Sequence, residues 1–422
     1  MKIFFITGKL KNPDTACGSV IEFDYKMREL QRLGNEVTAV TVFSYNNDLK
    51  KSPPYRLIEE FIRPPTLFSI HWNIFKILRK YEKEADIFYI EGQFMYGAGL
   101  YRRLGGLRPI FAYLMREPLI KDDAYVSFVF QKYSSKKRNY SLRAFWRFCK
   151  KKIRRFIERF ILMWLNRKID YVACLNPMQA KEFYNTGLKA AIHPLIIGDP
   201  YPMDEVMKKA GINEFSYRNR AGKNDKVTIF YSGRMTAGKG YDLLLTGFSQ
   251  VKNKERFHLI LGGSGPEEPK VRQMINDFKL EPYIEMPGWV SRDELYEFLK
   301  QADIYVFTRW GRNLSAVAMT EAVVFGLPSI VPAGTGLAWL AGKSALTFKE
   351  EDPEDLARQI ERLEADLELR KELSRQCYER LKEPDLDPHQ TIVAMNVIMK
   401  SLVFGPRDKY PLDEFVNGFH KK

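Results

Sequence analysis

The chain has 422 residues, of which 45% are hydrophobic, and a formal net charge of +15. This length exceeds one ordinary hydrophobic core and suits two domains. Cysteines at 17, 149, 174 and 377 are scattered without a CxxC pair, which fits reduced thiols in a cytoplasmic protein and excludes a zinc site of that type. No apolar run approaches about 18 residues, so no membrane-spanning helix is expected.

The first half of the chain alternates short apolar runs with longer helical patterns. Strands are expected at "KIFFITG", "EVTAVTVF", "ADIFYIEG", "PIFAYLMREP" and "DYVACLN", with a helix at "EFDYKMRELQRLG". The opening run is too short for a secretory signal and is typical of a first strand. This alternation indicates a doubly wound α/β domain over residues 1–197.

The same pattern begins again at "KVTIFYSG". The runs "FHLILGGSG", "YIEMPGWV", "DIYVFTRW", "LPSIVPAG" and "ALTF" follow it, which predicts a second Rossmann-like domain over residues 227–400. Residues 198–226 are polar, contain two prolines and are expected to be a linker region. Residues 401–422 form a tail that we expect to pack back on the first domain. A site is expected in the cleft where the carboxyl ends of the two sheets face each other.

The positive charge is concentrated between residues 131 and 168. This segment holds 14 Lys and Arg against one acidic residue, Glu158, and so carries +13 of the net charge. Within it, residues 145–165 show a helical stripe of apolar side chains (Phe145, Cys149, Ile153, Phe156, Phe160, Trp164). The opposite side carries Lys150, Lys151, Arg154 and Arg155, among others. Such a helix suits an anionic membrane surface, whereas the alternative is a core helix with a solvated basic face. Nucleic-acid binding is not expected, because no nucleic-acid-binding motif accompanies the charge.

The stretch "SGRMTAGKG", residues 232–240, follows a predicted strand and contains G-x-x-x-x-G-K, the opening of a Walker A loop. A Walker A loop needs Ser or Thr next, because its hydroxyl ligates Mg²⁺, and here the residue is Gly240. Arg234 adds a second cation, so that Arg234 and Lys239 suit a diphosphate held without a metal. The alternative is an ordinary turn with two solvated cations.

Two further loops follow strands of the second domain. "GGSGPEE", residues 262–268, is glycine-rich but lacks the dinucleotide fingerprint spacing. After "DIYVFTRW" a helix is expected to begin near Asn313 to Ser315, with free amides that favour an anion. Glu321 lies two turns on, among apolar residues where an idle carboxylate is costly, and suits the hydroxyls of a ribose. Its alternative role is a solvated surface charge.

These motifs together resemble the retaining glycosyltransferases of family 4, which have the GT-B fold of two Rossmann-like domains. The ordered series is "SGR....KG", "GGSGPE", "PGWV", "ADIYV" and "TEAVVFGLPSIV". The resemblance implies that Arg234 and Lys239 hold the donor diphosphate, with Gly265 and the amides near Val317 and Ala318. It implies that Glu321 binds the ribose.

The resemblance also implies roles for residues elsewhere in the chain. Gly18 matches the glycine near the phosphates and acceptor, and Asn313 stands where the family has the Glu that contacts the transferred sugar. Arg116-Glu117 resembles an Arg-Asp pair of relatives that act on lipid-linked acceptors. Glu117 is therefore a catalytic candidate, and Glu91 is a weaker candidate for touching sugar or acceptor. Either carboxylate could instead form a structural ion pair.

The function implied is transfer of a sugar from a nucleotide-diphosphate donor to a lipid-linked or cell-surface glycan, with retention and without a metal cofactor. Such a protein is expected in the cytoplasm, at the inner face of the plasma membrane. Asn313 motivates the alternative of a catalytically impaired, glycosyltransferase-like binding or scaffold protein. A third reading is an Mg²⁺-dependent nucleotide hydrolase, against which Gly240 speaks. Asp385-Leu386-Asp387 has the letters of a metal motif, but its proline-flanked position predicts a turn and helix cap.

Overall fold

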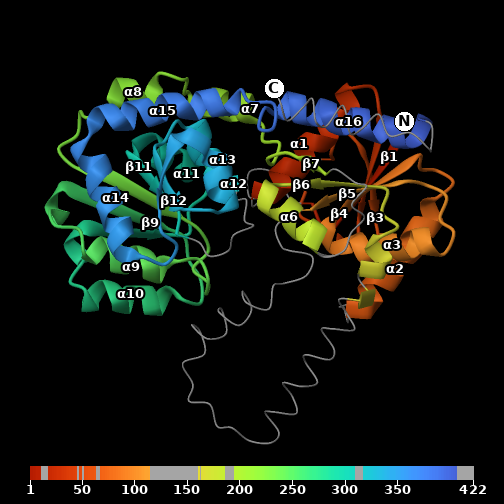
Figure 1. Cartoon of the computed structure of the whole chain (residues 1–422), viewed down its shortest axis with the longest axis horizontal. Helices are drawn as coiled ribbons and strands as arrows, with labels where there is room; N and C mark the ends of the chain where they lie inside the picture. The colour runs from red at the N-terminus through yellow and green to blue at the C-terminus, as the bar shows by residue number, and fades with distance from the viewer. Residues whose placement is uncertain are drawn as a thin grey trace, which may run out of the picture. The chain divides into compact units, whose positions relative to one another are not determined.

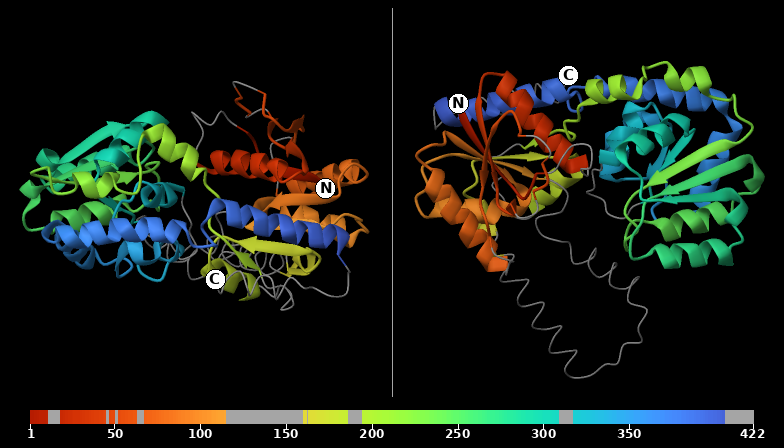
Figure 2. Two further views of the ribbon diagram at one scale, coloured as in Figure 1. Left: turned by 90° about the horizontal axis from the view of Figure 1, so that it is seen from above. Right: turned by 180° about the vertical axis from the view of Figure 1, so that it is seen from behind.

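The computed structural model describes residues 1–10, 18–44, 47–49, 52–62, 67–114, 160–161, 163–185, 194–308 and 317–405. The chain divides into two compact units, shown in Figures 1 and 2. The first unit comprises Met1–Asn12, Phe23–Ile197 and His389–Lys422, and the second comprises Pro13–Glu22 and Gly198–Pro388. Each unit is an α/β domain with a parallel sheet, as the sequence predicts.

The sheet of the first unit has the strand order β3-β2-β1-β4-β5-β6-β7, with every pair parallel. Its strands are β1 (Lys2–Thr7), β2 (Glu36–Thr41), β3 (Arg56–Glu59), β4 (Ile87–Glu91), β5 (Ile110–Leu114), β6 (Tyr171–Cys174) and β7 (Leu195–Ile196). Its longer helices are α1 (Gly18–Arg32), α2 (Leu67–Tyr81), α3 (Met95–Arg103), α6 (Pro177–Asn185) and α16 (Pro388–Phe404).

Helices cover both faces of this sheet because its strands are apolar on both sides. Alternate residues of β1 enter different cores: Ile3 and Phe5 pack with α1 and α16, whereas Phe4 and Ile6 pack with α2 and α3. Figure 1 shows α2 and α3 on one side of the sheet and α16 on the other. Because successive side chains of a strand point to opposite faces of the sheet, β1 contributes to both hydrophobic cores.

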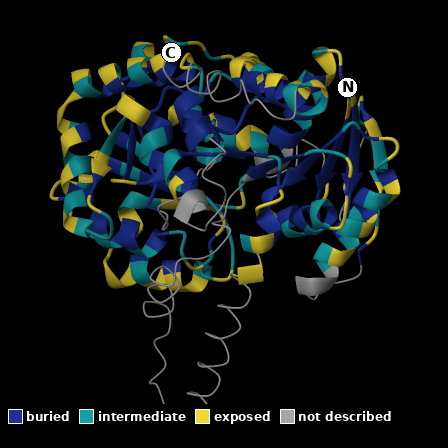
Figure 3. Cartoon of the chain, turned by 45° about the vertical axis from the view of Figure 1, so that its right-hand side comes forward, coloured by how far each residue is buried: buried dark blue, intermediate teal, exposed yellow. Residues whose placement is uncertain are grey.

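The sheet of the second unit has the strand order β10-β9-β8-β11-β12-β13 and is also parallel. Its strands are β8 (Val227–Ser232), β9 (Phe257–Gly262), β10 (Ile284–Gly288), β11 (Ile304–Val306), β12 (Ser329–Pro332) and β13 (Ala345–Phe348). Helices α9 (Tyr241–Ser249), α10 (Glu268–Asp277) and α14 (Pro353–Ala365) cover one face. The other face carries α7 (Met203–Ala210), α8 (Ser216–Arg220), α11 (Arg292–Gln301), α12 (Val317–Val324), α13 (Gly336–Ala341) and α15 (Leu367–Leu381). Figure 3 shows both sheets as buried layers beneath partly exposed helices.

The observed division of the chain differs from the predicted one in two places. Residues 198–226 are not a bare linker, because they form α7 and α8, and Val206 and Tyr217 of these helices are buried in the second unit. Helix α16 is not part of the second domain, which was predicted to extend to residue 400. Its side chains Met395 and Ile398 lie in the core of the first unit. Helices α7 and α8 were not predicted because they are short and carry polar residues on their outer faces. The unit to which α16 belongs was not predicted because this helix is far in sequence from the sheet that it covers.

The segment Asp385-Leu386-Asp387 forms the turn between α15 and α16. The backbone N–H groups of Leu386 and Asp387 donate to the carbonyl of Glu383 at 2.9 and 2.8 Å. The Asp385 carboxylate accepts from Arg380 at 2.7 and 3.1 Å. The predicted turn is therefore present, and Asp385 is engaged in a bidentate ion pair.

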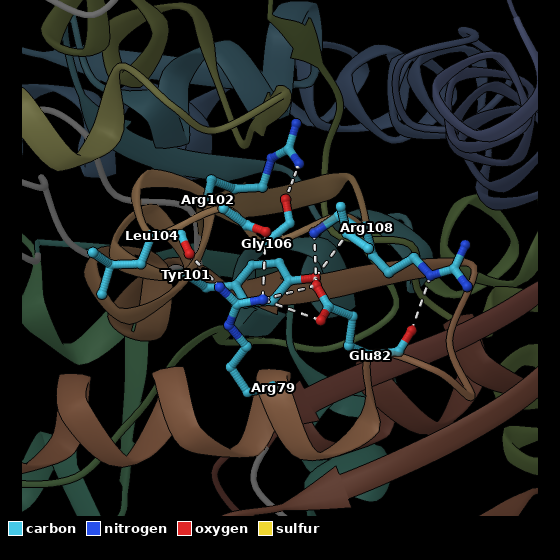
Figure 4. A network of polar contacts seen from close by, with 9 residues as sticks. Arg79, Glu82, Tyr101, Arg102, Leu104, Gly106 and Arg108 are labelled. Carbon is cyan, nitrogen blue, oxygen red and sulfur yellow. Dashed lines mark hydrogen bonds and ion pairs between the residues drawn. The ribbon is translucent and has the colours of Figure 1, made fainter.

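A polar network fixes the corner where α3 turns into β5 (Figure 4). Glu82 accepts from the Tyr101 hydroxyl and from the Leu107 N–H, both at 2.6 Å, and from Arg79 at 3.1 Å. Arg102 donates to the Gly106 carbonyl at 2.5 Å. One partly buried carboxylate thus organises the turn that begins a central strand.

Among the residues described, no helix is both long and apolar enough to cross a membrane.

Candidate functional site

Two loops at the carboxyl ends of β8 and β9 are joined by backbone hydrogen bonds. Gly233 N–H donates to the Gly262 carbonyl at 3.0 Å, and Met235 N–H donates to the Ser264 carbonyl at 2.9 Å. In return, Glu267 N–H donates to the Met235 carbonyl at 3.0 Å. These reciprocal bonds make residues 233–240 and 262–267 one interlocked structure, which we call the glycine cradle.

Glycine is required in the cradle for steric reasons. A Cβ atom at Gly263 would lie 2.0 Å from the Gly233 carbonyl oxygen, and one at Gly265 would lie 2.4 Å from the Met235 carbonyl oxygen. Both glycines have positive φ, 129° and 157°. The two loops can therefore pack backbone against backbone only because these residues lack side chains.

The surroundings of Gly240 argue against a Walker A loop. It has φ of 81°, and a Cβ atom would lie 2.1 Å from the backbone oxygen of Thr308. The Thr308 hydroxyl donates to the Gly240 carbonyl at 2.7 Å, which ties this turn to the end of β11. The position thus has no room for the Ser or Thr that would ligate Mg²⁺ in a Walker A loop.

The two predicted diphosphate ligands belong to the cradle. Arg234 is exposed, and its side chain has no hydrogen-bond or ion-pair partner among the described residues. Lys239 is half-buried, and its carbonyl accepts from the Tyr231 hydroxyl. A planar guanidinium at the mouth of β8 is thus available to an anion, next to a second cation five residues on.

Glu321 is buried in α12, with 4% of its surface exposed. Its Oε1 atom accepts hydrogen bonds from the Tyr201 hydroxyl at 2.9 Å and from Nη1 of Arg292. Burial opposes the positive charge of Arg292, but the charge and hydrogen bond of Glu321 outweigh it and raise the Arg292 pKa. Burial, followed by the negative charge of Glu321, raises the Tyr201 pKa well above its ordinary value. Glu321 is therefore a buried, paired carboxylate and not a solvated surface charge.

In the first unit, Glu91 lies at the carboxyl end of β4 and is 9% exposed. It accepts from the Thr7 hydroxyl and from the Gln93 amide at 2.6 Å, while Gly8 N–H lies 3.4 Å from its Oε1. Of the two arginines that could pair with it, Arg102 pairs instead with Asp170 at 2.7 Å, and Arg116 lies outside the described residues. This polar cluster occupies the carboxyl edge of β1 and β4.

The structure brings together several of the predicted site residues. Arg234, Lys239 and Gly265 share the cradle, and Val317, Ala318 and Glu321 lie on α12, which follows the neighbouring strand β11. Gly18 begins α1 and lies in the stretch Pro13–Glu22, which belongs to the second unit. The other predicted residues lie outside the described residues: Asn313, Glu117, Lys150, Lys151, Arg154 and Arg155. Among the described residues, no group of three or more His, Cys, Asp and Glu side chains could hold a metal ion.

The sequence prediction missed Arg292 and Tyr201, which bind the Glu321 carboxylate. Arg292 is the first residue of α11 and Tyr201 precedes α7, so both are far from Glu321 in sequence. The one signal was Glu321 itself, because a carboxylate among apolar residues requires partners. Nothing in the sequence indicated which residues those partners would be.

The protein-family comparison matches residues 213–380, which include the glycine cradle and α12, to the model described as glycosyl transferases group 1. This part of the chain is therefore similar to a glycosyl transferases group 1 domain. The match begins within the residues predicted to be a linker, in agreement with the helical structure found there.

Two curated relatives match part of the chain. Mannosylfructose-phosphate synthase of Agrobacterium fabrum is 29% identical over 202 residues, 45% of this chain and 44% of the relative. The putative colanic acid biosynthesis glycosyltransferase WcaL of Salmonella typhimurium is 27% identical over 157 residues, 35% of this chain and 39% of the relative. The chain thus matches less than half the length of either relative.

Solved structures resemble the fold over nearly its whole length. HepE of Anabaena, crystallised in complex with UDP, has a TM-score of 0.65 at 14% identity, covering 94% of this chain and 100% of that chain. Together with the two parallel sheets, this likeness shows a GT-B fold. The sequence prediction of the fold class is confirmed.

Proposed function

We propose that this protein is a retaining glycosyltransferase of family 4 that moves a sugar from a nucleotide-diphosphate donor to a lipid-linked or cell-surface glycan. The observation that carries the proposal is the glycine cradle, in which Arg234 is exposed. A diphosphate needs close backbone approach and a forked cation, and the cradle supplies both. The colanic acid assignment of one relative supports a glycan acceptor.

In the proposed reaction the bond between the sugar and the donor phosphate breaks, and the acceptor oxygen bonds to the same carbon. Arg234, Lys239 and the first amides of α12, at Val317 and Ala318, stabilise the charge that develops on the leaving phosphate. An oxygen of that phosphate takes the acceptor proton, so the scheme requires no metal. Asn313 would contact the transferred sugar, and Glu117 would lie on the acceptor side.

The first test is thermal stability of the protein with UDP, GDP, ADP, dTDP and ATP, each with and without Mg²⁺. A ligand at about 100 times its dissociation constant adds about 2.7 kcal/mol of stability, which is readily measured. We expect a shift with at least one diphosphate that a chelator does not remove. A shift seen only with ATP and Mg²⁺ would instead favour a nucleotide hydrolase, and the absence of any shift would contradict a working donor site.

Substitution of Arg234 tests its role directly. Because Arg234 would stabilise developing charge, Arg234→Ala should lower the rate of sugar transfer by about 100- to 1000-fold, or roughly 3–4 kcal/mol. Arg375→Ala is the matched control, since Arg375 is exposed on α15 and pairs only with Glu372 among the described residues. Equal activities in the two variants would remove Arg234 from the mechanism.

The second candidate is a catalytically impaired binding or scaffold protein, motivated by Asn313 in place of the family Glu. Such a protein would bind the donor nucleotide but would not turn over. Turnover with any nucleotide sugar, lost in Arg234→Ala, excludes it.

We also propose that the basic segment, residues 131–168, docks the protein on an anionic membrane at the cytoplasmic face. Most of this segment lies outside the described residues. At its described end, Phe160 and Trp164 of the apolar stripe are 68% and 46% exposed, which supports an interfacial face over a core helix. Flotation with anionic vesicles should be lost when Lys150, Lys151, Arg154 and Arg155 are made neutral. Unchanged flotation would contradict this docking role.

A further inference from the structure

The two oxygen atoms of Glu321 have different surroundings. Oε1 accepts two hydrogen bonds, from the Tyr201 hydroxyl and from Nη1 of Arg292. No described residue donates to Oε2. A carboxylate offers about four lone-pair sites, two on each oxygen. With both sites of Oε1 filled by protein donors, the sites that remain lie on Oε2.

The two donors are held rigidly on separate elements. Arg292 is the first residue of α11, and the capping box of Ser291 and Glu294 fixes where that helix begins. The Tyr201 side chain is 2% exposed and belongs to the hydrophobic core between α7 and α12. Side chains that are locked by packing hold a third group in one orientation better than solvated ones do.

We infer that Arg292 and Tyr201 are positioning residues that tie down Oε1 of Glu321, so that Oε2 is presented to the vicinal hydroxyls of the donor ribose. The inference rests on the proposed function. The two open sites of Oε2 match in number the two hydroxyl hydrogens of a ribose. The binding site therefore takes ribonucleoside diphosphates in preference to 2′-deoxy forms.

The geometry distinguishes this role from a purely structural ion pair. A structural pair would be needed for folding, and its loss would affect all ligands equally. A positioning pair contributes through the ribose hydroxyls alone, because a site built to bond a hydroxyl rejects an analogue that lacks it. The discriminating quantity is the ratio of the dissociation constants of the 2′-deoxy ligand and the ribo ligand.

The experiment measures this ratio by titration calorimetry for UDP, GDP and ADP and their 2′-deoxy counterparts, using the full chain. In the wild type we expect the ribo form of the preferred base to bind at least about tenfold more tightly than the deoxy form. Tyr201→Phe removes one donor to Oε1 and nothing else from the side chain. In this variant the ratio should fall below about threefold, while binding of the deoxy form changes little.

Tyr217→Phe is the matched control. Tyr217 is also buried in the second unit, and its hydroxyl donates to the Asp303 carbonyl at 2.8 Å, away from Glu321. It should keep the wild-type ratio even if it loses stability, and Arg292→Lys should lower the ratio as Tyr201→Phe does. An unchanged ratio in Tyr201→Phe and Arg292→Lys, with normal binding of the ribo form, would overturn the positioning role alone. If no nucleotide bound the wild type, the proposed function and this inference would fail together.

Discussion

At the scale of single residues, the glycine cradle depends on glycines, which have no Cβ atom. Gly238 and Gly240 both have positive φ, 83° and 81°, yet their surroundings differ. A Cβ atom on Gly238 would meet nothing within 4 Å, whereas one on Gly240 would lie 2.1 Å from backbone. The two positions therefore separate the cost of a left-handed backbone from the cost of a collision.

Gly240→Ala should disrupt the cradle, because the backbone of Thr308 cannot give way as a flexible side chain would. We expect a loss of more than about 2 kcal/mol of unfolding free energy and at least tenfold weaker binding of the preferred nucleoside diphosphate. Gly238→Ala should cost only about 1–2 kcal/mol, from the positive φ. Denaturant unfolding and calorimetry measure both quantities, and equal effects of the two substitutions would contradict the proposed role of close packing.

His71 of α2 is a second residue whose behaviour follows from its surroundings. Its ring meets Tyr96 edge to face at 5.0 Å, and neither ring nitrogen has a partner among the described residues. Burial lowers the pKa of His71 from 6.5 to about 4. The unfolded chain therefore takes up a proton near pH 6.5, while the folded protein takes it up only near pH 4.

The unfolding free energy should therefore fall as the pH is lowered from about 6.5 to about 4, because the unfolded state binds more protons in this range. His71→Phe keeps an aromatic ring against Tyr96 and removes the titrating group. The stability of the wild type relative to this variant should be constant above pH 7 and decline below pH 6. Denaturant unfolding at several pH values measures the difference, and parallel pH profiles would contradict the assignment.

At the scale of elements, the sequence predicted what periodicity and apolar runs encode. All six strands of the second unit coincide with predicted runs. The inner strands β8, β9, β11 and β12 are mostly buried, and a parallel strand buried on both faces reads as an apolar run. The edge strands β10 and β13 are only partly buried. Strands β3 and β7 were missed: β3 is only partly buried, and β7 is two residues long. The two loops of the cradle were predicted as loops at strand ends, since glycines and cations follow a strand directly, but the hydrogen bonds that join them were not. The hydrogen bonds of Arg292 and Tyr201 to Glu321 were not predicted, because these donors come from elements that only tertiary folding brings together.

Helix α16 shows how a distant element completes a core. Its side chains Ile392, Met395 and Met399 pack against the sheet of the first unit, and Asn396 accepts from the Asn35 amide at 2.9 Å. The helix closes one face of a sheet whose last strand ends at Ile196, far earlier in the chain. Its contribution to stability should therefore be as large as that of any local helix.

Met395→Ala should destabilise the first unit by about 2–5 kcal/mol, because Met395 is fully buried and its truncation leaves a cavity. Val397→Ala on the same helix is the control, since Val397 is 38% exposed and should cost less than about 1 kcal/mol. Thermal unfolding compares the two. Similar small effects would show that α16 does not complete the core of the first unit.

At the scale of the whole molecule, each unit has its own sheet with both faces covered. In the second unit, one core lies beneath α9, α10 and α14 and the other beneath α11, α12 and α15. A domain with its own complete core can fold alone. The chain enters this unit at Gly198 and leaves it at Pro388, apart from the short stretch Pro13–Glu22.

A fragment of residues 198–388 should therefore be soluble, unfold cooperatively and bind the same nucleoside diphosphate as the full chain, although it lacks residues 13–22. A fragment of residues 227–400, the boundaries that sequence patterns alone suggest, should aggregate. It removes Val206 and Tyr217 from a core and exposes Met395 of α16 to water. Size-exclusion chromatography and thermal unfolding of the two fragments measure the difference. If the 227–400 fragment were as well folded as the 198–388 fragment, α7 and α8 would be dispensable, and the second unit would be smaller than its packing indicates.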